Sequence, residues 1–131
     1  MAFLPFLTPD TEAGEVVISK SVSSAFVGTN LEEVIRNAGI RTLVIAGLVT
    51  DGCVNSTTRM AADLHVVDEV DGEGNVVKGG KGRLILVADT TATFEKGGFD
   101  AETVQGVSLA SLKGEFAEIM GTEEVVTLLG L

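Results

Sequence analysis

Short apolar runs alternate with longer amphipathic stretches along this chain. Four of the runs, at residues 16–19, 43–47, 84–88 and 116–120, are mostly β-branched and continuously apolar, with no strict alternation of polar and apolar positions. Such runs are typical of strands covered on both faces, as in a parallel sheet. The pattern therefore predicts four strands.

The stretches between these runs have helical character. TNLE (residues 29–32) has the form of a capping box, which predicts a helix that begins there and ends near Gly39. Further helices are predicted over residues 53–64, from an Asp100 cap to about residue 112, and from Thr122 to Gly130. Alternating strands and helices predict an α/β fold with three layers, α/β/α, around a mainly parallel sheet.

Residues 66–82 interrupt this alternation. Two β-prone pieces flank Asp71-Gly72, and the glycine-rich GGKG follows at residues 79–82, which together predict a hairpin inserted at the surface. These glycines precede a strand instead of joining a strand to a helix, so a nucleotide-binding loop is not expected. The whole chain, residues 1–131, is interpreted as a single domain carrying this insertion.

Composition narrows the classes of function. The 131 residues can bury a core without disulfides, and the one histidine and one cysteine provide no metal-ligand set, so neither metal nor cofactor is expected. A net charge of -10 repels phosphate backbones, which argues against a nucleic-acid partner. No apolar stretch approaches the ~20 residues of a membrane span. The start lacks the basic flank of a secretory signal, so a cytoplasmic protein is expected.

The single cysteine, Cys53, follows the second predicted strand and begins the second predicted helix. A thiol in that place faces unpaired backbone N–H groups and the positive end of the helix dipole, which stabilise the thiolate. Cys53 is therefore a candidate nucleophile. The alternative is that it is a small buried apolar side chain, which is the commoner role of a free cysteine.

Lys20 follows the first predicted strand. Because the carboxyl ends of parallel strands meet at one edge of a sheet, Lys20 is predicted to lie near Cys53. Its ammonium group would then stabilise the thiolate and a developing oxyanion. A solvated charge is the alternative for Lys20, and turn or capping roles are the simpler interpretation of Asp51 and Asp89.

Four segments together resemble the isochorismatase-like cysteine hydrolases, which include nicotinamidases, N-carbamoyl amide hydrolases and ureidoacrylate hydrolases. The segments are EVVISK at residues 15–20, SAFVGTNL at 24–31, GIRTLVIAG at 39–47 and TDGCV at 50–54. The resemblance implies a doubly wound α/β fold, with Cys53 as the nucleophile and Lys20 as the lysine of a catalytic triad.

The same resemblance implies further features of the site. A cis peptide bond is expected at Leu48-Val49, and the backbone amides of Val49 and Cys53 are expected to form an oxyanion hole. Phe26 and Ser24 are candidates for lining the substrate pocket, with ordinary packing as the alternative.

One part of the family pattern has no counterpart in this sequence. The triad aspartate of the family ends an N-terminal strand, whereas Asp10 lies in the turn TPDT without a preceding apolar run and is not assigned that role. The chain therefore resembles an N-terminally shortened member. The absent strand would lie beside the strand that leads to Cys53, and an uncovered edge there predicts a homo-oligomer.

The sequence thus predicts a cysteine hydrolase that cleaves a C–N bond of a small amide or ureido substrate. An alternative of another class is a shortened, catalytically impaired homologue with a role in assembly or binding. A third possibility is vinyl-ether hydrolysis of isochorismate, which needs no cysteine and is therefore disfavoured by Cys53.

Overall fold

The centre of the molecule is a parallel sheet. The computed structural model describes residues 2–131, and its sheet has the strand order β1 (Thr42–Ile45), β2 (Arg83–Val87) and β3 (Glu118–Met120). Val44 pairs with Ile85, and Leu86 pairs with Ile119, both in parallel register. Three of the four predicted strands are therefore confirmed, with each end within two residues of its predicted position.

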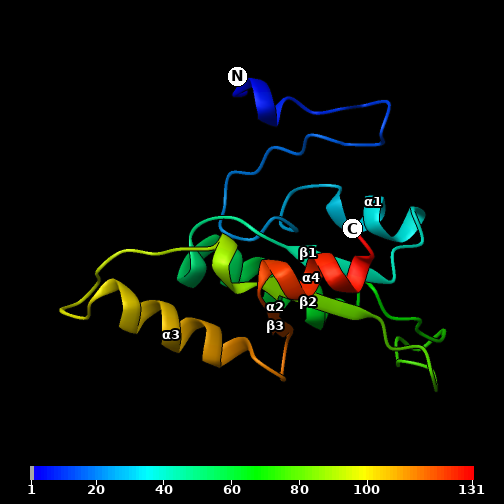
Figure 1. The fold of residues 1–131 in the computed structure, drawn as a ribbon. Coiled ribbons are helices and arrows are strands. Elements are labelled where there is room, and N and C mark those ends of the chain that lie inside the picture. Colours follow the sequence, from blue (N-terminus) through cyan, green and yellow to red (C-terminus); the bar gives the residue numbers. More distant parts are fainter. Residues whose placement is uncertain (1) are drawn as a thin grey trace.

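Helices cover both faces of this sheet (Figure 1). Leu84 and Leu86 of β2 belong to a core cluster to which three helices contribute, α1 (Leu31–Asn37), α2 (Asn55–Asp63) and α3 (Ala101–Leu112). Ile85 and Val87 face the other way and pack against Val125 of α4 (Thr122–Leu129). The middle strand is almost completely buried, as its continuously apolar sequence predicts, and the three-layer α/β/α arrangement is confirmed.

The predicted caps at two helices are confirmed. The Asp100 carboxylate accepts a hydrogen bond from the Thr103 N–H at 2.7 Å and so begins α3. Gly130 has the left-handed φ of 72° that ends α4. Asp89 takes the capping role expected of it, because it accepts hydrogen bonds from the N–H and the hydroxyl of Thr122 at 3.0 and 2.7 Å.

The capping box predicted for α1 is not formed. The Thr29 hydroxyl donates to the Ala25 carbonyl at 2.5 Å and accepts from the Leu31 N–H at 3.3 Å, so it caps a turn before the helix. Glu32, which would complete the box, instead forms an ion pair with Arg36 at 2.9 Å, one helical turn later.

The strand predicted at residues 16–19 is wrong. Val16 and Val17 are 61% and 59% exposed and pair with no strand, and the N-terminal segment runs apart from the sheet (Figure 1). β-branched residues favour a strand only where a neighbouring strand and a buried face receive them. In the described residues no strand pairs with the outer edge of β1, and residues 16–19 do not fill that place either.

Self-association therefore stays a prediction, now tied to the unpaired edge of β1 and to the exposed apolar N-terminal segment. Sedimentation velocity at micromolar concentrations should show a dimer or a larger species. A charged substitution on that segment, Val17→Lys, should shift the distribution towards monomer, whereas the same change in a surface loop, Asn75→Lys, should not. A wild-type chain that is monomeric at every concentration would contradict the prediction.

The segment at residues 66–82 is only partly a surface insertion. Its hairpin is reduced to one antiparallel bridge between Val70 and Val76. Val66 and Val67, at its start, are 3% and 5% exposed and belong to the core cluster. The outer part, residues 71–75, is exposed, whereas the ends of the segment pack as parts of the domain.

A buried carboxylate closes the base of this segment. The side chain of Asp68 is 2% exposed and accepts hydrogen bonds from the Gly82 N–H at 2.8 Å and from Lys81 Nζ and His65 Nδ1, each at 2.9 Å. Burial raises the pKa of Asp68, but the bonds to Lys81, His65 and Gly82 outweigh burial, and the net pKa lies below the ordinary value of 3.8.

Asp68→Ala should lower the free energy of unfolding by about 1–3 kcal/mol at neutral pH, because three donors lose their acceptor. A depressed native pKa stabilises the fold above pH 3.8, and this contribution is lost as the pH falls through the lower native value. The difference between wild type and variant in urea unfolding should therefore shrink in acid. Asp63→Ala, at an exposed position of α2, is the control and should change stability little.

Candidate active site

Cys53 lies where β1 leads into α2. The connecting turn, Thr50–Val54, is helical except at Gly52, whose φ and ψ of -115° and -109° kink it just before the cysteine. Cys53 is half-buried, and α2 begins two positions later. The thiol is thus at the N-terminal end of a helix and at the carboxyl end of a parallel strand, where α/β proteins bind ligands.

Lys20 is the neighbour of the sulfur. Lys20 Nζ lies 3.3 Å from Cys53 Sγ and donates a second hydrogen bond to the Val22 carbonyl at 2.9 Å. Within residues 2–131, Sγ makes no other hydrogen bond. Lys20 reaches this place from a segment without regular secondary structure, although it was predicted to follow a strand of the sheet. The structure therefore brings the two predicted residues together by a different route.

The segment after Lys20 is anchored to the body of the domain. The Ala25 N–H donates to the Thr57 hydroxyl of α2 at 3.0 Å, and the Phe26 N–H donates to the Ser24 hydroxyl at 3.2 Å. Phe26 is 8% exposed and belongs to the core cluster, and Ser24 is 6% exposed. Both have the packing role that was the alternative for them. A contact of either residue with substrate stays a prediction.

The peptide bond between Leu48 and Val49 is cis, as the resemblance to the family implies. The Val49 carbonyl accepts hydrogen bonds from the N–H groups of Gly52 and Val54 at 3.1 and 3.2 Å. Among the described residues, the Val49 N–H has no acceptor, which leaves it able to donate to a bound oxygen atom. The role of the Val49 and Cys53 amides in binding an oxyanion stays a prediction.

No carboxylate takes the third place of the triad in the part of the chain that the structure describes. Asp10 accepts hydrogen bonds from the N–H groups of Glu12 and Ala13 at 3.0 and 3.1 Å, so it caps its own turn. Asp51 is the carboxylate nearest to Cys53 along the turn. It bonds to the Thr93 hydroxyl and, at 2.5 Å, to Lys96 Nζ.

Sequence analysis missed this role of Asp51, which it interpreted as a turn or capping residue. The ion-paired hydrogen bond with Lys96, followed by the bond from Thr93, holds the pKa of Asp51 below its ordinary value of 3.8. Lys96 is 45 positions away in the sequence. A contact of that separation has no local signal, because it depends on two connections of the sheet lying side by side.

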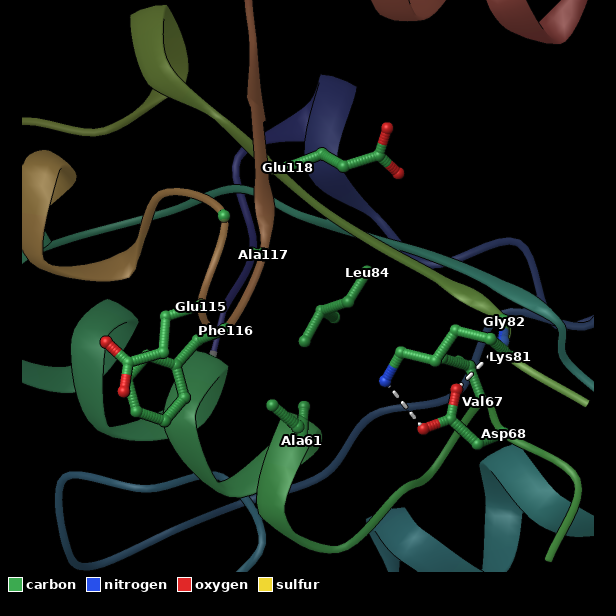
Figure 2. Close-up of a pocket in the computed structure, with 12 residues that line it drawn as sticks. Ala61, Val67, Asp68, Lys81, Gly82, Leu84, Glu115, Phe116, Ala117 and Glu118 are labelled. Carbon is green, nitrogen blue, oxygen red and sulfur yellow. Dashed lines mark hydrogen bonds and ion pairs between the residues drawn. The ribbon is translucent and has the colours of Figure 1, made fainter. Parts of the chain in front are cut away.

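A hollow of about 250 Å³ lies at the other end of the sheet. Its walls come from the ends of α2 and the starts of β2 and β3, and Figure 2 shows Lys81 and Asp68 on one side and Glu115 and Phe116 on the other. Ligands of parallel α/β sheets bind at the carboxyl ends of strands, whereas this hollow lies at the amino ends. It is therefore separate from the site around Cys53.

The described residues hold neither a metal-ligand cluster nor a membrane-spanning helix. Residues 2–131 contain no group of three histidine, cysteine or acidic side chains arranged to hold a metal ion. In the same part of the chain, no helix combines the length and the apolar character needed to cross a bilayer.

Comparison with known proteins decides the family. The model of the Isochorismatase domain matches residues 1–124. The chain belongs to the isochorismatase family. The uncharacterized isochorismatase family protein YrdC of Bacillus subtilis is 38% identical over 117 residues, which cover 86% of this chain and 54% of YrdC. Ureidoacrylate amidohydrolase RutB of Methylorubrum extorquens is 45% identical over 58 residues, which cover 44% of this chain and 23% of RutB.

Solved structures agree with this assignment. A crystal structure of a hydrolase of the isochorismatase family from Chromobacterium violaceum matches with a TM-score of 0.73 and 34% identity, over 98% of this chain and 60% of that one. The chain thus spans little more than half the length of YrdC and of this structural neighbour. The α/β fold and the family are shared over nearly the whole of the present sequence.

Proposed function

We propose that this isochorismatase-family chain hydrolyses a C–N bond of a small amide or ureido compound, with Cys53 as the nucleophile. The observation that carries the proposal is the 3.3 Å contact between Lys20 Nζ and Cys53 Sγ at the start of α2. An ammonium group and a helix N-terminus both stabilise a thiolate, which is the nucleophilic form of cysteine. The similarity to RutB, named a ureidoacrylate amidohydrolase, supports the same class of substrate.

In the first step, the thiolate attacks the carbonyl carbon of the substrate. A C–S bond forms, the carbonyl oxygen gains negative charge, and the Val49 N–H, which has no acceptor among the described residues, donates to it. As the C–N bond breaks, the Lys20 ammonium gives its proton to the leaving nitrogen, which departs as ammonia or an amine. An acyl or carbamoyl thioester on Cys53 and a neutral Lys20 remain.

In the second step, water attacks the thioester. The neutral amine of Lys20 takes a proton from that water as the new C–O bond forms, and the C–S bond then breaks. The product leaves as a carboxylic or carbamic acid, and the thiolate and the ammonium group are restored. Both proton transfers are assigned to Lys20, because in the described residues it is the titratable side chain that contacts the sulfur.

Ammonia release from ureidoacrylate, maleamate and nicotinamide tests this function. The wild-type chain should release ammonia from at least one of these compounds, and mass spectrometry after acid quenching should find an acyl or carbamoyl group on Cys53. A panel that gives no turnover above that of Cys53→Ala, and no adduct, would overturn the proposal.

A second candidate is a catalytically impaired member that serves assembly or binding. It is favoured by the lack, within residues 2–131, of a carboxylate bonded to Cys53 or Lys20. The two candidates differ in the reactivity of the thiol. A hydrolase requires Cys53 to react with iodoacetamide near neutral pH faster than a model thiol does, whereas a binding module does not.

A further inference from the structure

Two connections at the carboxyl edge of the sheet are joined side by side. The connection from β1 to α2 contains Cys53, and the connection from β2 to α3 lies along it. The Gly47 N–H donates to the Thr90 carbonyl at 3.4 Å, and the Thr50 N–H donates to the Ala92 carbonyl at 3.0 Å. These backbone hydrogen bonds are the first of a series of contacts between the two connections. Side-chain hydrogen bonds continue the series towards Cys53.

The inner part of the series is a buried hydroxyl network. Thr50 is fully buried, and its hydroxyl donates to Gln105 Oε1 of α3 at 2.5 Å while lying 2.7 Å from the Thr91 hydroxyl. Gln105 Nε2 in turn donates to the Thr91 carbonyl at 3.1 Å. With the polar groups satisfied in this way, the network fixes the start of the nucleophile's turn.

The outer part of the series is Asp51, two positions before Cys53. Its carboxylate accepts from the Thr93 hydroxyl and from Lys96 Nζ, and its side chain is 19% exposed, against 48% for that of Lys96. Past Asp51, no hydrogen bond from the Thr93–Lys96 part of the neighbouring connection reaches the turn in the described residues. Asp51 therefore accepts the last hydrogen bonds that join the two connections before Cys53.

Lys96, which forms the ion pair with Asp51, is itself fixed by backbone hydrogen bonds. The Lys96 N–H donates to the Phe99 carbonyl at 3.0 Å, and the Phe99 N–H donates to the Lys96 carbonyl at 2.9 Å. Gly97 and Gly98 between them have φ of 58° and 83°, the left-handed values that a tight two-residue turn requires. An ammonium group based on such a turn can hold Asp51 in one place.

We infer that Asp51 is a positioning residue for the nucleophile: through Thr93 and Lys96 it keeps the Thr50–Val54 turn in the place that sets Cys53 Sγ against Lys20. The inference rests on the proposed function and deepens it. The competing interpretation is an ordinary surface ion pair that adds a little stability and leaves the thiol unaffected.

Asp51→Asn separates these interpretations by the sign of its effect. Removing an anion near the thiol would, by charge alone, favour the thiolate and speed its alkylation by iodoacetamide near neutral pH. If Asp51 positions the turn, the sulfur loses its contact with Lys20 and the rate falls, by about threefold or more, because the thiolate is the reacting form. Under the surface-pair interpretation, the rate stays the same or rises.

Two further variants complete the test. Lys96→Met should slow alkylation as Asp51→Asn does, whereas Lys96→Arg, which can still bond to the carboxylate, should keep the wild-type rate. At a pH that ionises any thiol, all the rates should converge if the variants change only the thiolate fraction. Wild-type or faster alkylation in Asp51→Asn, or equal rates in Lys96→Met and Lys96→Arg, would overturn the inference.

Lys20→Met, measured beside these variants, distinguishes a failure of the positioning role of Asp51 from a failure of the proposed function. If it slows alkylation and Asp51→Asn does not, the inference about Asp51 fails and the proposed function stands. If Lys20→Met also leaves the alkylation rate unchanged, Lys20 does not stabilise a thiolate at Cys53. The inference about Asp51 and the proposed function then both fail.

Discussion

Cys53→Ala should lower the rate of amide hydrolysis by at least about 10³-fold, because the substitution removes the atom that forms the covalent intermediate. The variant should still fold, because Cys53 is only half-buried. Among the described residues, Lys20 alone forms a hydrogen bond to its sulfur. Ammonia release by the purified variant, on whichever compound the wild type cleaves, measures the loss.

The control for this prediction is stability. Urea unfolding of Cys53→Ala should match that of wild type within about 1 kcal/mol, since a single sulfur atom at a half-buried position is lost. Cys53→Ser puts a hydroxyl of similar size in place of the thiol and should be as inactive, because a hydroxyl is far less acidic than a thiol and the neighbouring Lys20 ammonium does not supply the base needed to ionise it. Turnover in either variant above the uncatalysed rate would show that the nucleophile is another group or a water molecule.

Lys20 is expected to have two separable effects, one on the thiolate and one on the proton transfers. Lys20→Met removes both, so iodoacetamide alkylation near neutral pH should slow by about tenfold and hydrolysis should be lost. Lys20→Arg keeps the positive charge but cannot give up its proton. It should therefore keep much of the alkylation rate and still lose hydrolysis, by about 10² to 10⁴.

Lys78→Met is the matched control for Lys20→Met, because Lys78 is exposed in the segment at residues 66–82 and makes no hydrogen bond or ion pair in the described residues. It removes the same charge from the chain without touching the site. Hydrolysis by Lys20→Arg at the wild-type rate would show that Lys20 acts by charge alone. The proton carrier would then be another group.

The sequence predicts the middle of the sheet and the helix caps better than it predicts which segment pairs with the edge of the sheet. β2 is a run of apolar residues that needs cover on both faces, and this requirement fixed its place in the centre of the sheet. The caps of α3 and α4 are local interactions with clear signals, Asp100 and Gly130. Residues 16–19 have the same β-branched character, yet their state depends on whether a neighbouring strand is available, which a local pattern does not report.

The site divides in a similar way. The placing of Cys53 follows from strand and helix order. Lys20 was predicted beside it from the end of a strand at residues 16–19 that does not form, and the resemblance to the family implied the same pair. The ion pair between Asp51 and Lys96 could not be predicted from the sequence. It joins two connections whose conformation is determined only when the sheet and α3 pack together. The same is true of Thr50 and Gln105, whose polar character gives no hint that they meet in a buried network.

The ionisation of Cys53 itself is the most direct measurement, and this chain is well suited to it. It has one cysteine and neither tyrosine nor tryptophan, so a change in ultraviolet absorbance with pH reports this thiolate alone, with Cys53→Ala as the blank. At neutral pH, the wild type should show more thiolate absorbance than Lys20→Met, because Lys20 Nζ lies 3.3 Å from Cys53 Sγ and stabilises the anion. Equal thiolate absorbance in the two proteins would contradict the role of Lys20 in forming the nucleophile.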